Sequence, residues 1–131
     1  MATKVNTRLA NHVADALFDS FAGGMLEIRT GSQPASADAS APGVLLVEIV
    51  LPSPAFKNAV GGTKAKIGTW RGTAVGAGTA GWCRFRNEKD TLRFDGSVTM
   101  GPGGEIVLDN TNIAEGQVVT VNTGSATQPT N

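Results

Sequence analysis

Apolar and polar side chains alternate most clearly between residues 79 and 98, where the pattern predicts one β-hairpin. On its first arm Trp82, Arg84 and Arg86 share one face, because strand side chains alternate with a period of two. The charged, turn-prone residues 87–91 form the expected tip. The hairpin also holds four of the largest apolar side chains, namely Trp82, Phe85, Leu92 and Phe94. We therefore expect the hydrophobic core to gather on it.

Residues 7–22 carry the clearest helical pattern. Apolar residues recur there at spacings of three and four, as on one face of an α-helix: Leu9, Val13, Ala16, Leu17 and Phe21. Two glycines at positions 23–24 supply a C-terminal stop. Residues 1–6 are expected to form an N-terminal arm.

Two strands and a long loop are expected next. Residues 25–30 alternate as a half-buried strand. Residues 44–51 form a nearly continuous apolar run, which predicts a central strand covered on both faces. Glu48, the charge within that run, is expected at an edge or in solvent. Residues 31–43 are rich in Ser, Ala and Pro and longer than usual connections, so this loop is either functional or mobile.

Further short strands are expected over residues 63–75, 105–108 and 117–122, the first range holding two strands or one strand broken by a bulge. One helix followed by seven or eight short strands predicts a mainly β fold. We expect an antiparallel jelly-roll-like sandwich or barrel with one N-terminal α-helix. The chain is expected to be a single domain, with its β-domain over residues 25–122 and a flexible C-terminal tail over 123–131.

Composition narrows the classes of function. The 131 residues carry no formal net charge, so the basic excess that non-specific nucleic-acid binding requires is absent. No apolar run reaches the length of about 18 residues that a membrane-spanning helix needs. The N-terminus lacks a secretory pattern, so we expect the chain to be made and kept in a cytoplasm.

The residue types indicate no catalytic chemistry, no cofactor and no metal site. The single Cys83 can form no internal disulfide and is expected to be a small buried filler. The lone His12 lies on the polar side of the predicted helix, without partner ligands. The glycine-rich residues 72–81 lack the helix that follows a phosphate-binding loop, since a strand follows instead. We therefore expect a protein that is not an enzyme.

Two features are candidates for a binding surface. Arg84, Arg86 and Arg93 form a local basic cluster in the hairpin. This cluster is either a solvated face with cross-strand ion pairs or a docking patch for an acidic partner surface. Trp70, beside Arg71, is either an interface anchor or part of the core, and burial is favoured because aromatic residues make up only 5% of the chain.

The order of several motifs resembles a known group of proteins. The motifs are a helix ending in Gly-Gly, then Leu-Glu-Ile-Arg-Thr-Gly, Gln-Pro-Ala-Ser-Ala-Asp-Ala, Pro-x-Phe at 54–56, Gly-Thr-Ala-Gly-Trp-Cys-Arg-Phe, and Leu-Asp-Asn-Thr-x-Ile-x-x-Gly-Gln at 108–117. This order, which covers the chain from about Leu9 to Val121, resembles small virion proteins of tailed bacteriophages. That group includes capsid cement, or decoration, proteins with jelly-roll folds.

The resemblance implies a capsid decoration protein that binds and stabilises the shell of the major capsid protein. It would lie on the capsid surface of the virion after synthesis in the host cytoplasm. Extended terminal arms make Thr3, Lys4 and Gln128 candidate contacts, beside the hairpin arginines and Trp70. We expect a homo-oligomer, with a dimer favoured over a trimer. The alternative is a tail, neck or fibre module that binds a host glycan through an exposed Trp70.

Overall fold

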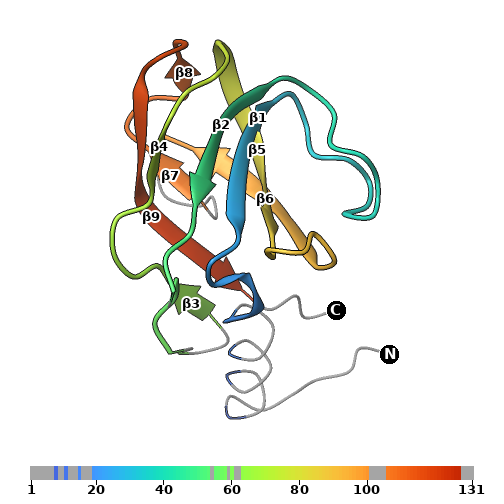
Figure 1. Ribbon diagram of the computed structural model, residues 1–131, viewed down its shortest axis with the longest axis vertical. Coiled ribbons are helices and arrows are strands. Elements are labelled where there is room, and N and C mark those ends of the chain that lie inside the picture. The colour runs from blue at the N-terminus through green and yellow to red at the C-terminus, as the bar shows by residue number, and fades with distance from the viewer. Residues whose placement is uncertain are drawn as a thin grey trace.

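A computed structural model, shown in Figure 1, describes residues 19–53, 55–58, 60, 63–100 and 106–127, together with Arg8, Asn11 and Asp15. The elements are the 3-10 helix η1 (Asp19–Phe21) and the strands β1 (Met25–Thr30), β2 (Leu45–Val50), β3 (Thr63–Ala65), β4 (Arg71–Thr73), β5 (Gly78–Arg86), β6 (Arg93–Thr99), β7 (Ile106–Leu108), β8 (Asn112–Ile113) and β9 (Val118–Thr127). The described part is mainly β, as the sequence predicts. Most of the helix predicted over 7–22, and the arm over 1–6, lie outside the described residues.

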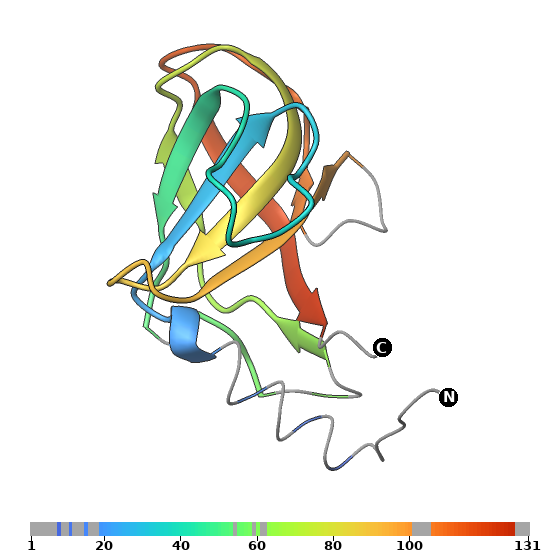
Figure 2. The same ribbon diagram turned by 90° about the vertical axis from the view of Figure 1, so that its right-hand side faces the viewer.

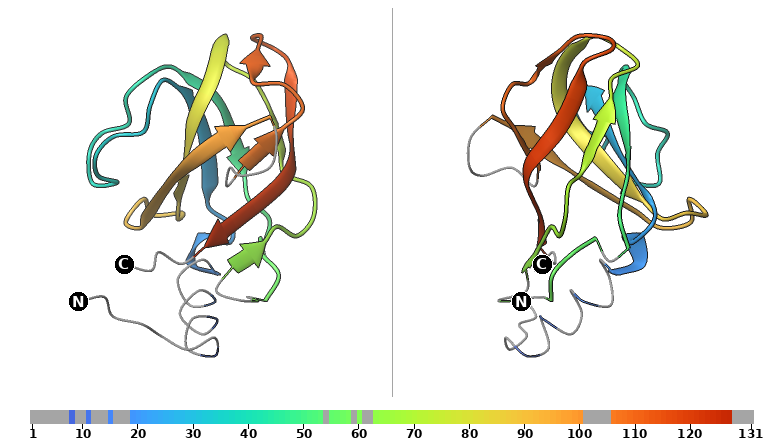
Figure 3. Two further views of the ribbon diagram at one scale, coloured as in Figure 1. Left: turned by 180° about the vertical axis from the view of Figure 1, so that it is seen from behind. Right: turned by 60° about the vertical axis from the view of Figure 1, so that its left-hand side comes forward.

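The strands form one sheet that curls until it is nearly closed (Figure 1). The strand order is β2-β1-β5-β6-β7-β9-β3, with β4 paired to β9 and β8 paired to β5. Figure 3 shows β4 between β9 and β2. Just after β4, the backbone N–H groups of Val75 and Gly76 donate to the carbonyl oxygen of Leu46 in β2, at 2.8 and 3.3 Å. Among the strand pairs of the described residues, β6 and β7 are parallel and the others antiparallel.

Aromatic rings fill the interior of this barrel. Phe56 and Trp70 meet edge to face with their ring centroids 5.3 Å apart, and Phe85 lies 5.9 Å from Trp70. Phe21 from η1 and Phe94 from β6 lie 6.1 and 6.0 Å from Phe85. Aromatic pairs at such separations contribute about 0.5–1.5 kcal/mol each beyond the area they bury. A chain with few aromatic residues thus concentrates them around Phe85.

The predicted hairpin is confirmed as β5 and β6, with Phe85 directly opposite Phe94. Cys83 is completely buried on the core side, as the alternation predicts. The expectation that the core gathers on the hairpin holds only in part. Trp82 is buried outside the main core cluster, and Leu92, just before β6, is 47% exposed.

Two strands differ from their predicted positions. The β2 strand, expected in the centre and covered on both faces, lies at the end of the strand path, and Val50 is 68% exposed. Its exposed Glu48 agrees with the prediction. The β9 strand ends at Thr127 instead of at residue 122, because its backbone continues to pair with β3. Residues 123–127, predicted to belong to a flexible tail, therefore lie in a strand.

The approach of β4 to β2 requires a residue without a side chain at Gly72. A Cβ atom at this position would lie 2.7 Å from the carbonyl oxygen of Glu48. It would also lie 3.1 Å from a side-chain carbon of Val47 and 3.3 Å from one of Ile49. Backbone therefore meets backbone where the barrel closes, and this closeness depends on glycine.

We expect Gly72→Ala to lower the free energy of unfolding by about 1–3 kcal/mol, the usual cost of overpacking, because β2 and β4 must move apart. Urea denaturation followed by circular dichroism measures this change. The neighbouring exposed Thr73→Ala serves as the control and should change stability by less than about 0.5 kcal/mol. A Gly72→Ala protein as stable as the parent would contradict this account of the closure.

Candidate functional site

A row of charged side chains crosses the outer face of the sheet, by which we mean the side of β2, β1, β5 and β6 turned away from the core. Glu48 of β2 lies opposite Glu27 of β1. Glu27 lies opposite Arg84 of β5, which in turn lies opposite Asp95 of β6. Directly opposite residues point to the same side of a sheet, so four strands contribute neighbouring charges.

Arg84 is the buried cation of this row, with only 3% of its side chain exposed. Its Nε and Nη2 donate to the two carboxylate oxygens of Asp95 at 2.8 and 3.1 Å. Its Nη1 donates to the carbonyl oxygen of Ala39 at 2.9 Å. Paired hydrogen bonds between a guanidinium and a carboxylate are strong and directional. Because both groups are shielded from water, loss of either would leave an uncompensated buried charge.

Glu27 is a second buried carboxylate, and two arginines share it. Arg29 Nε donates to Oε1 at 3.0 Å, and Arg86 Nε donates to Oε2 at 2.7 Å. Arg86 also donates from Nη2 to Glu48 Oε2 at 3.0 Å. A carboxylate with 7% exposure is tolerated in the middle of a strand only when such partners compensate its charge.

The long loop of residues 31–43, which we call the cover loop, lies over this face (Figure 2). Its base is closed by Thr30 and Val44: the Thr30 N–H donates to the Val44 carbonyl at 3.1 Å, and the Val44 N–H donates to Thr30 Oγ1 at 2.9 Å. Gly43 allows this closure with φ of 81°, and a Cβ there would lie 2.2 Å from the Thr30 carbonyl oxygen.

Arginines from the hairpin hold the far part of the cover loop. Besides the bond from Arg84 to Ala39, Arg93 Nη1 donates to the carbonyl oxygen of Ala37 at 3.3 Å. Arg93 itself is oriented by Asp90, whose two carboxylate oxygens accept hydrogen bonds at 3.0 and 3.1 Å. The loop contains no large apolar side chain, so these hydrogen bonds to its carbonyl groups determine where it lies.

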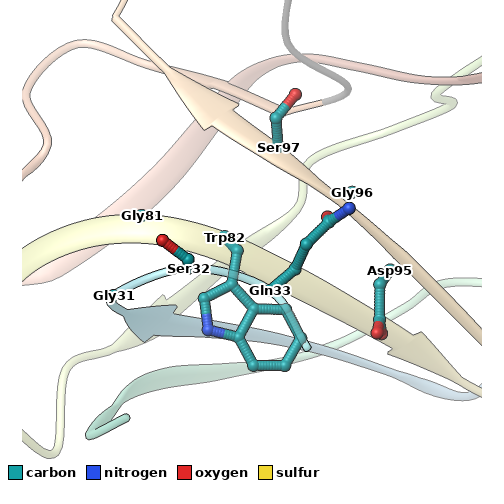
Figure 4. A pocket seen from close by; sticks show the side chains of 8 residues that line it. All are labelled: Gly31, Ser32, Gln33, Gly81, Trp82, Asp95, Gly96 and Ser97. Carbon is teal, nitrogen blue, oxygen red and sulfur yellow. The ribbon is translucent and has the colours of Figure 1, made fainter. Parts of the chain in front are cut away.

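Trp82 is buried beneath the cover loop. It is 1% exposed, its Nε1 donates to the Thr30 carbonyl oxygen at 3.1 Å, and the Arg84 guanidinium lies 5.3 Å from its ring centroid. Figure 4 shows Trp82 and Asp95 in the wall of a hollow of about 300 Å³. Because the ring is covered, this hollow offers polar groups and no open aromatic surface.

The arrangement is suited to binding more than to proton transfer. Each of the carboxylates Glu27, Asp90 and Asp95 has both oxygens hydrogen-bonded to arginine. Such bonds occupy the lone pairs of these carboxylates, so the three groups hold the arginines in place and leave few acceptor sites open.

The structure brings the three predicted hairpin arginines together. Arg84 and Arg86 form the cross-strand ion pairs that one of the two interpretations expected, whereas Arg93 pairs with Asp90 of the hairpin tip. The face is not solvated at Arg84, because the cover loop lies over it. Arg86 and Arg93 keep 23% and 29% of their side chains exposed. Of the three hairpin arginines, Arg86 and Arg93 are therefore partly accessible to a partner, whereas Arg84 is buried and holds neighbouring segments together.

The remaining predicted contacts lie elsewhere. Trp70 is completely buried in the aromatic core, and its Nε1 donates to the Ile67 carbonyl oxygen at 3.1 Å. It therefore presents no ring to a partner protein or to a glycan. Thr3, Lys4, Gln128 and His12 lie outside the described residues.

Sequence reasoning missed Glu27 and the role of the cover loop. Glu27 alternates with the apolar residues of its strand, which assigns it to the face turned away from the core. The alternation does not show that this face is covered, as it is at Glu27. The sequence does contain one indication of such partners, because the arginines of β5 need acidic side chains nearby to balance their charge. Which acids come close depends on strand register, and a single sequence does not state it.

In the described ranges, no group of three or more His, Cys, Asp or Glu residues could hold a metal ion. None of the residues that the structure describes belongs to a helix long and apolar enough to cross a membrane. A scan against protein-family models and searches of curated proteins and of solved structures found no match for this chain.

We expect Arg84→Met to lower the free energy of unfolding by about 3–5 kcal/mol, because Asp95 would remain buried without its cation. The double variant Arg84→Met/Asp95→Leu should recover part of this loss, since both charges are then removed together. Urea denaturation of the single and double variants measures the coupling. Arg71→Met, at an exposed position of β4, is the matched control. A loss below about 1 kcal/mol for Arg84→Met would instead describe an ordinary surface ion pair.

Asp90 should produce a small pH dependence. Hydrogen bonds from Arg93 hold the pKa of Asp90 below its ordinary value of 3.8. Its contribution to stability is therefore present above the ordinary pKa and is lost as the pH falls through the lower, folded-state pKa. The effect is small because the side chain is largely in solvent.

In the parent protein, the urea concentration at the unfolding midpoint should fall as the pH drops below 3.8, the ordinary pKa of an aspartate. We expect this fall to be shallower in Asp90→Asn, which lacks the titrating carboxyl group. Glu115→Gln, at an exposed position, is the control for loss of a carboxylate. An identical slope for the parent and Asp90→Asn would contradict the role given to Arg93.

Proposed function

We propose that this chain is a non-enzymatic structural protein of a tailed-bacteriophage virion, a decoration protein that binds the shell of the major capsid protein. The observation that carries the proposal is where the phage-like motifs fall in the fold. Residues 26–31 form most of β1 and the start of the cover loop, 33–39 form its far part, and 78–85 form most of β5. The three motifs together build one unit, the cover loop above Trp82 and Arg84.

The physical properties of this unit support a binding role. A decoration protein must keep its shape while it is held against a lattice of other subunits. The cover loop, the hairpin and β1 are joined by hydrogen bonds to buried charged groups, which makes this side of the barrel stiff. Little conformational entropy is then lost when it binds. Many copies on a symmetric shell also gain avidity from individually weak contacts.

Exposed apolar side chains favour association with other subunits. Val50 lies on β2, Val75 follows β4 and Val118 begins β9, and they are 68%, 62% and 58% exposed. The strands β2, β4 and β9 are neighbours in the barrel. Burying them against another subunit would remove apolar surface from water. We propose a homo-oligomer, a dimer in the first instance, as part of the same function.

The test compares heads of the encoding phage prepared with the gene intact and with the gene deleted. We expect intact heads to contain the chain at a copy number comparable to that of the major capsid protein. Heads without it should release DNA at lower temperature and after a smaller reduction in salt, because the shell loses contacts between subunits. Nuclease-accessible DNA after a heat or low-salt challenge measures this loss.

Adding the purified chain back to deleted heads should restore their resistance and carry the chain into the head pellet. Sedimentation velocity of the purified chain reports the oligomer. Heads of unchanged stability that do not bind the chain would contradict the proposal. Recovery of the chain only with tails or fibres, at low copy number, would replace it with a tail or fibre function.

A further inference from the structure

A second hollow of the outer face, of about 250 Å³, lies between the cover loop and the hairpin. We call it the arginine pocket, and its lining includes Arg29, Arg84, Arg86 and Arg93 together with Glu27 and Asp90. Four guanidinium groups thus surround one small space together with two carboxylates. Such a surplus of planar donors is the chemistry that recognises carboxylates and other oxyanions.

The four arginines are not equally committed to internal partners. Arg84 and Arg93 each hold one carboxylate with two hydrogen bonds and a loop carbonyl with a third. Arg29 uses Nε and Nη1, and Arg86 uses Nε and Nη2. Within the described residues, Nη2 of Arg29 and Nη1 of Arg86 therefore keep donors for a ligand.

These two arginines are also accessible and share one anion. Their side chains are 18% and 23% exposed, and both donate to the same buried Glu27. Arg86 also binds a second carboxylate, that of Glu48. Glu48 does not line the pocket, and its side chain is 38% exposed. The hydrogen bond from Arg86 Nη2 to Glu48 is thus a contact between a guanidinium and a carboxylate at the surface. A carboxylate of another protein can make the same kind of contact with Arg86.

We propose that the arginine pocket binds a carboxylate side chain of an acidic segment on a partner protein, with Arg29 and Arg86 as its donors and Glu48 as an internal competitor. That the partner belongs to a virion shell rests on the proposed function, whereas the binding of a carboxylate does not. Charge selects a carboxylate over a more highly charged anion. The lining carries a surplus of two positive charges, and the neighbouring Asp95 and Glu48 balance it, so no net positive charge remains that would favour an anion with more than one charge.

The test uses the purified full-length chain and a short capped peptide rich in glutamate, titrated by isothermal calorimetry at constant ionic strength. The glutamine version of the peptide is the neutral comparison. We expect Arg29→Gln to weaken binding of the glutamate peptide about tenfold, the loss typical of one charge-assisted hydrogen bond. Arg71→Gln removes the same charge at an exposed site on β4 and should change affinity by less than about twofold.

Glu48→Gln, at a surface position, should raise the affinity for the glutamate peptide, whereas Arg29→Gln should lower it. Without its competitor, Arg86 should bind the glutamate peptide several-fold more tightly, while Glu115→Gln, an equal charge change elsewhere, should leave affinity unchanged. Because Glu48 is exposed, this result does not depend on whether Arg29→Gln folds.

Three results would overturn the proposal: equal binding of the glutamate and glutamine peptides, equal weakening by Arg29→Gln and Arg71→Gln, or no gain for Glu48→Gln. Inorganic phosphate binding more tightly than the peptide would assign the pocket to phosphate and would also overturn it. Because these titrations contain no phage heads, their failure is separate from failure of the proposed function. If the chain binds the peptide but does not bind phage heads, the carboxylate-binding proposal stands and the proposed function in the virion shell is contradicted.

Discussion

The rest of the structure depends on the buried guanidinium of Arg84. It joins β5 to β6 through Asp95 and joins both strands to the cover loop through Ala39. Removing a guanidinium and a carboxylate from water costs several kcal/mol per ion, and only a complete set of partners compensates for it. The pair also fixes the register of the hairpin, because a slip by one residue would turn Arg84 into the apolar core.

Two different interiors meet at the middle strands of the sheet. On one side lie the aromatic rings around Phe85, which are held mainly by packing, with one hydrogen bond from Trp70 to the carbonyl oxygen of Ile67. On the other side lie Trp82 and the charged row, which are held by directional hydrogen bonds beneath the cover loop. The apolar side supplies most of the stability, whereas the polar side specifies which segments lie together. β1 and β5 are therefore covered on both faces, by the aromatic core on one and by the cover loop on the other.

The sequence allowed prediction of those features that depend on neighbouring residues. The hairpin, the strand at 25–30, the buried Cys83 and the grouping of the arginines all follow from local alternation. Features that depend on distant segments were not predictable in this way. The apolar run of β2 predicts a central strand, yet whether a strand is covered depends on what packs over it, and β2 lies at the end of the strand path. The cover loop has no apolar pattern at all, so nothing local shows that it lies over Trp82.

The C-terminal strand has a consequence for how the chain is made. β9 pairs with β7, β3 and β4, so it connects the later strands to the earlier ones. Before β9 has left the ribosome, β1, β2, β5 and β6 can already associate, but the edges that β9 will cover remain open. Such edges attract strands from other nascent chains. The barrel can therefore close only after β9 has left the ribosome, and not when the hairpin emerges.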